Sequence, residues 1–218
     1  MLLGQKVNPR VAKMRTLPQG VDQRSACRHP DWTGPDDLAI KILELREMTD
    51  WEKPVYVKVG ATRTFHDVKL AVHSGADVVV VDGMQGGTAA TQTCFIEHVG
   101  IPTLAAVRQA VEALEDLNMK GTVQLIVSGG IRTGADVAKA LAMGADAVAI
   151  GQGVLFALGC NSETYVRNGQ HHSALDAYDA IGTAPGYCHR CHTGKCPVGV
   201  TTQDAELEQR LEIGRAHV

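Results

Sequence analysis

The sequence predicts an α/β protein that forms part of a (β/α)8 TIM barrel, namely its last four βα units, followed by an irregular cysteine-rich C-terminal segment. Three observations lead to this prediction. Apolar runs of strand length alternate with segments of helical period along residues 36–159. The stretch 66–83 is repeated at 135–152, so that Gly75-Ala76-Asp77 recurs as Gly144-Ala145-Asp146. Glycines follow the apolar runs, as they do where parallel strands enter loops on one rim.

The elements can be placed in chain order. Residues 1–35 carry scattered Pro and Gly, which predicts an irregular approach segment with a turn or two of helix near Val11 to Met14. A helix begins at Pro35 and should pack on a sheet, and another covers about 134–143. The expected strands, all parallel and buried on both faces, are residues 55–59, 78–82, 123–127 and 147–150.

Four βα units are half of a barrel that usually takes about 250 residues, so the chain looks incomplete, and an open doubly wound sheet is the alternative. The expected organisation is an approach segment (1–35), half of the barrel (36–159), an insertion with a cysteine loop (160–204) and a tail (205–218). The final residues, Glu212 to Val218, can be back-translated into a sequencing adapter and are excluded from the fold prediction.

Composition narrows the function classes. The chain has 218 residues, of which 44% are hydrophobic and 21% charged, with a net charge of −3, as in an ordinary soluble globular protein. No basic stripe with interleaved aromatics is present, so no nucleic-acid partner is expected. No apolar run reaches the roughly 20 residues of a membrane span, and a cytoplasmic location is expected.

Two glycine-rich turns predict a phosphate site. Ser128-Gly129-Gly130-Ile131-Arg132 follows one strand and Gly151-Gln152-Gly153 follows the next. Backbone N–H groups can approach an anion there because no Cβ intervenes, and the helix start at Thr133 would add its positive dipole end. The alternative is that small residues only permit sharp turns.

Lys58 is the predicted catalytic side chain. A lysine in a strand buried on both faces needs a carboxylate, a phosphate or a polar cofactor, because an unpaired ammonium is costly there. A structural ion pair is the alternative. The next strand ends in a loop with three glycines, 82–88, which suits close approach of a flat or anionic ligand.

The cysteines predict a metal centre. Cys188, Cys191 and Cys196 form a C-x2-C-x4-C pattern followed by Pro, a spacing close to that of iron–sulfur loops. Zinc, with His189 or His192 as a further ligand, is the alternative. Cys160 could be a fourth ligand, whereas Cys27 and Cys94 are expected to be ordinary small buried thiols.

These motifs together resemble a known family. Val57-Lys58, Gly86-Gly87-Thr88, Thr133-Gly134-x-Asp136-Val137 and the run CHTGKCPVG at 191–199 are similar to the C-terminal half of the FMN-binding barrel domain of the glutamate synthase large subunit, with its iron–sulfur loop. The resemblance runs from Gly4 to Asp204. It implies an oxidoreductase in which reduced FMN converts 2-iminoglutarate, made from 2-oxoglutarate and ammonia, into L-glutamate, while an iron–sulfur cluster relays electrons to FMN.

The resemblance also implies roles for particular residues. It places the FMN phosphate on the turns after the third and fourth strands, Lys58 against the flavin or the 2-oxoglutarate carboxylate, and the loop after the second strand beside the isoalloxazine. The residues assigned to FMN are Lys58, Gln85, Gly86, Gly87, Thr88, Ser128, Gly129, Gly130, Arg132, Gly151 and Gln152. The implied partners are an electron donor protein or NAD(P)H-oxidising subunit and a glutaminase domain or subunit.

The sequence departs from the family pattern in two places. The family cluster motif is C-x5-C-x4-C, and Cys160 matches its first cysteine, but an insertion from Asn161 to Tyr187 follows and Cys188 is additional. A three-iron (3Fe-4S) cluster is implied by the resemblance, with a four-iron (4Fe-4S) cluster as the alternative. The family commonly has His-Asp where this chain has Met84-Gln85. An N-methylglutamate synthase-type subunit, another nucleotide-binding barrel oxidoreductase and a zinc-stabilised scaffold therefore stay open.

Overall fold

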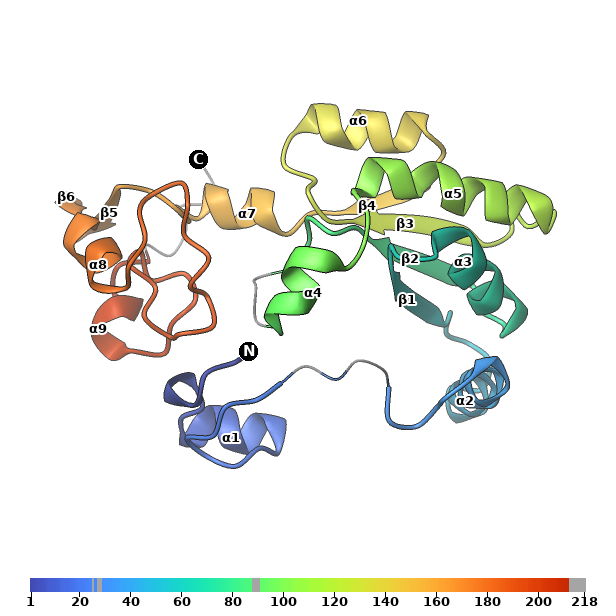
Figure 1. Ribbon diagram of the computed structural model, residues 1–218, viewed down its shortest axis with the longest axis horizontal. Coiled ribbons are helices and arrows are strands. Elements are labelled where there is room, and N and C mark those ends of the chain that lie inside the picture. Colours follow the sequence, from blue (N-terminus) through green and yellow to red (C-terminus); the bar gives the residue numbers. More distant parts are fainter. Residues whose placement is uncertain (25, 27–28, 88–90, 212–218) are drawn as a thin grey trace. The chain divides into compact units, whose positions relative to one another are not determined.

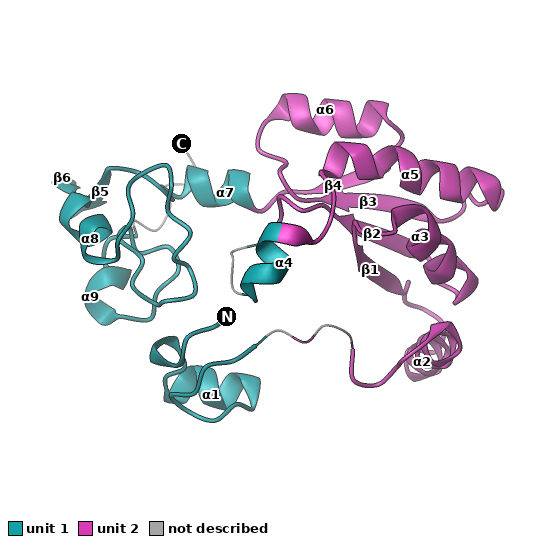
Figure 2. Cartoon of the chain, in the orientation of Figure 1, with its two compact units in different colours: residues 1–25, 87–97, 152–218 teal, residues 26–86, 98–151 magenta. Residues whose placement is uncertain are grey.

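The computed structural model describes residues 1–24, 26, 29–87 and 91–211 (Figure 1). Within these residues the chain forms two compact units, shown in Figure 2. Unit 1 comprises residues 1–25, 87–97 and 152–218, and unit 2 comprises residues 26–86 and 98–151. The predictions for Cys27, Thr88 and the tail 212–218 fall outside the described residues.

Unit 2 contains the predicted parallel sheet. Its strands are β1 (Tyr56–Gly60), β2 (Val78–Asp82), β3 (Gln124–Ser128) and β4 (Ala147–Ala149), each within a residue or so of its predicted bounds. They are hydrogen-bonded in the order β1-β2-β3-β4, and all three pairings are parallel. Sequential parallel strands joined by helices are the arrangement of a partial (β/α)8 barrel, which confirms the predicted fold class.

Helices cover one face of this sheet (Figure 1). They are α3 (Thr64–His73), α5 (Thr103–Asp116) and α6 (Gly134–Ala142), and the short α4 (Thr93–His98) precedes α5. Alanines and valines of α5 that are fully buried, among them Ala106, Val107 and Ala110, pack against β2 and β3. The strand side chains in this core are Val57, Val59, Val79, Val81, Leu125, Val127 and Val148.

The opposite face of the sheet is open in the described residues. Among the described alternate residues on this face, Val78 is buried, but the others are not: Tyr56, Lys58, Gly60, Val80, Asp82, Gln124, Ile126, Ser128, Ala147 and Ala149. The expectation that the strands are buried on both faces is therefore wrong for this chain. The physical reason is the one-sided layer of helices, which covers only every second side chain of each strand.

Helix α2 (Pro35–Met48) begins at the predicted proline but does not pack on the sheet. It contacts α3 instead, and Ile42 is its buried residue. The hydroxyl of Ser74, just after α3, donates to the Pro35 carbonyl oxygen at 3.2 Å. Ile40 and Met48 of this helix remain exposed.

The internal repeat has a structural counterpart at the strand starts. Asp77 precedes β2, and its carboxylate accepts the Val55 N–H at 2.7 Å and an Arg46 N–H at 2.9 Å. Asp146 precedes β4, and its carboxylate accepts the Leu125 N–H at 2.7 Å. Each aspartate thus ties the start of its own strand to the strand beside it, which fixes the parallel register.

Unit 1 contains short elements around a small core. They are η1 (Gly4–Lys6), α1 (Pro9–Arg15), α7 (Gln152–Ala157), the antiparallel hairpin β5 (Thr164–Arg167) and β6 (Gln170–Ser173), α8 (Leu175–Ala180) and α9 (Ala205–Glu208). Ala174, Tyr178 and Val198 form the buried core. None of the helices described in either unit is long and apolar enough to cross a membrane.

Candidate functional site

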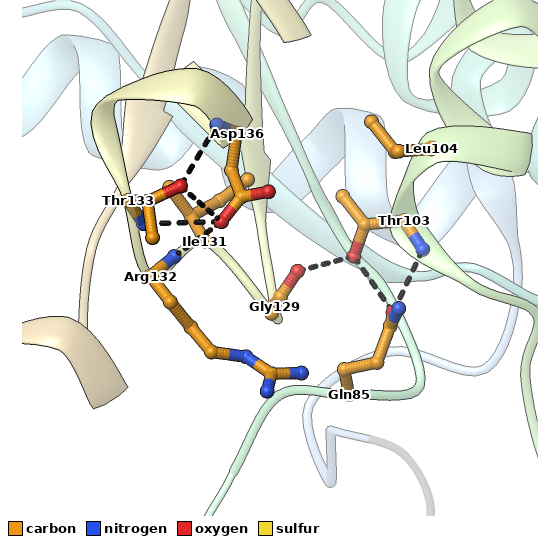
Figure 3. Close-up of a pocket in the computed structure, with 9 residues that line it drawn as sticks. Gln85, Thr103, Leu104, Gly129, Ile131, Arg132, Thr133 and Asp136 are labelled. Atoms are coloured by element: carbon orange, nitrogen blue, oxygen red, sulfur yellow. Dashed lines mark hydrogen bonds between the residues drawn. The ribbon is translucent and has the colours of Figure 1, made fainter. Parts of the chain in front are cut away.

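A cavity of about 360 Å³ opens in unit 2 where the loops after β2 and β3 meet the starts of α5 and α6 (Figure 3). It has the size of a small-molecule site and lies at the carboxyl ends of parallel strands, where ligands of such sheets bind. The residues that line it are Gln85, Thr103, Leu104, Gly129, Gly130, Ile131, Arg132, Thr133 and Asp136. Four predicted FMN-binding residues, Gln85, Gly129, Gly130 and Arg132, are thus brought together.

Thr103, at the start of α5, holds the cavity wall together. Its buried hydroxyl lies 2.6 Å from the Gly129 carbonyl oxygen and 3.0 Å from that of Ser128. Its backbone N–H donates to the side-chain oxygen of Gln85 at 2.9 Å. One residue therefore fixes both loops, and its distance in sequence explains why no local motif revealed it.

The two glycines of the β3 turn are required by packing. Gly129 and Gly130 have φ angles of 99° and 74°, a region that strains other residues. A Cβ on Gly129 would lie 2.9 Å from the Gly83 carbonyl oxygen, and one on Gly130 would lie 3.0 Å from the Gln85 side chain. Close approach of the two loops thus accounts for the glycines, and it leaves the cavity beside them.

The start of α6, which the phosphate prediction includes, already carries a carboxylate. Thr133 and Asp136 form a reciprocal capping box at the start of α6. The Asp136 carboxylate accepts the N–H groups of Arg132 and Thr133 at 3.1 and 3.0 Å, and these bonds hold the pKa of Asp136 below its ordinary value. These two N–H groups at the positive end of the helix are therefore already engaged by a carboxylate.

Arg132 supplies the positive charge of this cavity. Its side chain runs past Gly129 in the direction of Gln85 (Figure 3).

The other residues predicted to bind phosphate do not line this cavity. The carbonyl oxygen of Ser128 accepts the Gly83 N–H at 2.9 Å and so joins the two loops. Gly151 follows β4 two residues beyond Ala149, the register partner of Ser128, and so leaves the sheet at the same edge. Gly151 and Gln152 are not among the lining residues.

Lys58 lies on the open face of β1 and forms an ion pair. Its Nζ is 2.8 Å from Asp82 Oδ2, and 58% of its side chain is exposed. The other carboxylate oxygen, Asp82 Oδ1, is buried with no hydrogen-bond partner among the described residues. Gly86 leaves room for this oxygen, since a Cβ there would lie 2.6 Å from it. Gly87 follows with a φ of 91°.

A second cavity, in unit 1, is lined by all four cysteines predicted as metal ligands: Cys160, Cys188, Cys191 and Cys196. Asn161 joins Cys160 and Cys188, the two cysteines that the insertion separates in sequence. Its side-chain amide donates to Cys160 Sγ at 3.5 Å, and its side-chain oxygen accepts the Cys188 N–H at 2.9 Å. The structure therefore brings Cys160 and Cys188 together rather than choosing between them.

The thiols of this cavity are partly buried. Burial raises the pKa of Cys160 to about 11 and also raises the pKa of Cys188. Because a thiolate is the form that binds metal, a bound cation would have to displace the thiol protons here. The expectation that Cys94 is a buried thiol is wrong, because this residue lies exposed in α4, a helix without buried residues.

Two buried polar atoms beside the cysteines lack partners among the described residues: Arg190 Nε and Thr201 Oγ1. Both can donate a hydrogen bond, and inorganic sulfide or thiolate sulfur can accept it. The cavity is narrow, about 20 Å³, and no three His, Cys, Asp or Glu side chains described are placed to hold one metal ion. A cluster spreads its thiolates over several irons, and metal loading commonly orders its site, so the donor set fits a cluster.

A third cavity of about 600 Å³ lies in unit 1 behind the cysteine loop. Lys6, Arg15, Arg24 and His192 line it, and no Asp or Glu is among its lining residues. Lys6 Nζ donates to the Cys191 carbonyl oxygen at 2.6 Å, and burial lowers the pKa of Lys6. The cavity thus presents positive charge without a carboxylate to balance it, which suits an anion.

Comparison with known proteins identifies the family. The conserved region in glutamate synthase matches residues 1–168 and 178–218 of this chain. The chain belongs to the glutamate synthase family. The unmatched residues, 169–177, cover β6 and the start of α8, so the family region is interrupted between Cys160 and Cys188.

Several glutamate synthase relatives align with nearly the whole chain. A glutamate synthase large subunit-like protein of Rhizobium meliloti (strain 1021) is 64% identical over 97% of this chain and 46% of its own length. An archaeal glutamate synthase (NADPH) of Methanocaldococcus jannaschii is 37% identical over 100% of this chain and 38% of its own length. The chain therefore spans about half or less of these relatives.

Matches also include a more distant relative and a solved structure. The ferredoxin-dependent glutamate synthase of Pyropia yezoensis is 30% identical over 96% of this chain and 12% of its own length. A mandelate oxidase variant with an FMN monooxide adduct is 28% identical and covers 60% of this chain and 35% of that chain, with a TM-score of 0.41.

Proposed function

We propose that this glutamate synthase family member forms L-glutamate with bound FMN and an iron–sulfur cluster. When bound, FMN supplies the hydride that reduces 2-iminoglutarate, made from 2-oxoglutarate and ammonia. The observation that carries the proposal is the pairing, in one chain, of the cavity at Gly129, Gly130 and Arg132 with the cavity lined by four cysteines.

The cavity in unit 2 would hold the FMN phosphate. Arg132 would pair with the phosphate, and the backbone at Gly129 and Gly130 would approach it closely. Gly151 and Gln152 are assigned to the same phosphate from the neighbouring loop, and Ser128 to the base of the turn. Gln85 would lie beside the cofactor, and Gly86, Gly87 and Thr88 would continue that wall.

Lys58 is assigned to the flavin or to a substrate carboxylate. Its ammonium is held at the open face of the sheet by Asp82 and keeps more than half of its side chain accessible. A positive charge near the pyrimidine edge of a flavin stabilises the reduced anionic form. Lys58 would therefore act through charge while Asp82 fixes its position.

The positive cavity behind the cysteine loop would attract the dicarboxylate substrate. Lys6, Arg15 and Arg24 are cations that line it together, and 2-oxoglutarate carries two negative charges.

A second candidate product is an N-methylated amino acid, formed from an amine in place of ammonia. It is kept because Met84-Gln85 differs from the residues that are common in the family at these positions.

An electron donor protein or an NAD(P)H-oxidising subunit, and a glutaminase domain or subunit, are the proposed partners. Relatives whose names specify NADPH or ferredoxin support the first of these. We assign the protein to the cytoplasm, where the thiols of an iron–sulfur loop stay reduced until they bind the cluster.

The proposal is tested by measuring which cofactors the purified protein contains. The full-length protein, purified without oxygen, should release FMN and contain iron and acid-labile sulfide. Arg132→Ala should weaken FMN binding at least tenfold, whereas Arg108→Ala, a matched change on the exposed side of α5, should not. A colourless protein without flavin, or one zinc without sulfide, would refute the proposal. Comparing the turnover with ammonia and with methylamine as the co-substrate decides between L-glutamate and the N-methylated product.

A further inference from the structure

We propose that Cys160, Cys188, Cys191 and Cys196 together hold a four-iron, four-sulfide cluster, with Cys188 as the fourth ligand. This inference rests on the proposed function, in which the loop binds an iron–sulfur cluster. It goes beyond it by naming the kind of cluster and a cysteine that the three-cysteine family pattern lacks. All four cysteines line one cavity of unit 1.

Cys188 is brought to the other cysteines by specific contacts. The chain leaves Cys160, forms the hairpin β5–β6 and helix α8, and returns at Cys188. Asn161 joins the two ends of this excursion, because it contacts Cys160 Sγ and accepts the Cys188 N–H. The inserted segment is therefore closed at its base, and that closure delivers a fourth thiol to the site.

Cys188 also packs against buried side chains of unit 1. Together with Cys196 it packs against the small core of Ala174, Tyr178 and Val198, each at most 4% exposed. Tyr178 in turn donates its hydroxyl to the Ser162 carbonyl oxygen at 3.1 Å. Cys188 therefore has the surroundings of a positioned ligand rather than those of a surface thiol such as Cys94.

The unpartnered donors fit a charged cluster with four thiolates. Arg190 Nε and Thr201 Oγ1 line the same cavity, are buried, and have no acceptor among the described residues. Four thiolates carry more negative charge than three, and the Arg190 guanidinium supplies a compensating positive charge. Cluster sulfurs would give both donors the acceptors that the protein does not provide.

Four thiolates match the four irons of a cubane cluster one to one, whereas a three-iron cluster leaves one thiol without a metal. Iron and acid-labile sulfide, measured on the anaerobically purified full-length protein, should therefore approach equal amounts, near four of each per chain. The oxidised cluster should be silent in electron paramagnetic resonance (EPR), because the four-iron 2+ core is diamagnetic. The reduced cluster should be paramagnetic.

The decisive variant is Cys188→Ser. It should convert the cluster into a three-iron form held by the remaining cysteines, which is paramagnetic when oxidised. Cys94→Ser, the matched control in α4, should leave the spectrum unchanged. Native mass spectrometry of the unmodified protein gives the cluster mass directly and decides the question even if Cys188→Ser fails to fold.

The outcomes separate the two proposals. A three-iron mass with an EPR signal in the oxidised wild type, or an identical cluster in wild type and Cys188→Ser, would overturn the assignment of Cys188 while leaving the flavin and iron–sulfur function intact. A protein without iron and sulfide would overturn the proposed function itself.

Discussion

The hydroxyl of Thr103 lies 2.6 Å from the carbonyl oxygen of Gly129, and this contact joins the start of α5 to the turn after β3. The same threonine binds Gln85 through its backbone N–H. Two loops that line one cavity are thus held by a residue that contributes little to its surface. Thr103 thus adds contacts to both loops, beside the direct bond from the Gly83 N–H to the Ser128 carbonyl oxygen.

Thr103→Val keeps the size of this side chain and removes its donor. It should destabilise the protein by about 1–3 kcal/mol, because the Gly129 and Ser128 carbonyl oxygens lose a buried partner. Urea unfolding measures the loss, and flavin fluorescence titration should show weaker FMN binding. Thr122→Val, in an exposed turn, is the control. Equal stability of the two variants would contradict this account of the loops.

Lys58→Ala should separate activity from stability. Turnover should fall by about two orders of magnitude if the ammonium faces cofactor or substrate. The free energy of unfolding should change by only about 0–1 kcal/mol, because the Lys58 side chain is 58% exposed. Steady-state kinetics and urea unfolding provide the two readouts. Lys69→Ala, which removes the ion pair between Lys69 of α3 and Asp116 of α5, is the control. Parallel loss of activity and stability would indicate a structural ion pair.

Asp77 should make stability depend on pH. The Arg46 hydrogen bond, followed by that from the Val55 N–H, holds the pKa of Asp77 below its ordinary value of about 3.9. The folded state therefore gains stability above that ordinary value, and loses it as pH falls through the lowered pKa. Asp77→Asn should flatten the acid side of a plot of unfolding midpoint against pH. Asp50→Asn, in the loop after α2, should leave the plot unchanged, and a similar flattening there would contradict the assignment.

Thr201→Val should lower the reduction potential of the cluster. A hydrogen bond from Thr201 to a cluster sulfur would stabilise the reduced, more negative state by about 1 kcal/mol, which is about 40 mV for a one-electron couple. A redox titration followed by EPR measures the shift. Thr183→Val is the control, since that hydroxyl lies 3.3 Å from the Tyr187 carbonyl oxygen. An unchanged potential in Thr201→Val would show that the hydroxyl has no sulfur acceptor.

The sheet could be predicted because it depends on local patterns. Each strand is a short apolar run, and the repeat of Gly75-Ala76-Asp77 at Gly144-Ala145-Asp146 fixed the spacing. The expectation that both faces of the sheet are buried was wrong. The sequence of β1 already indicated one exposed face, because Tyr56 and Lys58 alternate with Val57 and Val59. A period of two indicates one buried face.

Parts of the site also had signals in the sequence. Thr133 and Asp136 have the spacing of a capping box, which indicates that a carboxylate occupies the start of α6. Asn168-Gly169 between two short polar-apolar runs is the usual signature of a hairpin turn. Thr103, Arg190 and Thr201 had no such signal, because their importance depends on contacts between distant parts of the chain.

The hairpin has a practical use. Its turn residues Asn168 and Gly169 have left-handed φ angles of 52° and 73°. The match to the family region is interrupted over residues 169–177. Since Asn161 closes the segment at its base, changes at the tip need not reach the cysteines. A spin label or fluorophore attached there would report on electron delivery from inside the loop itself.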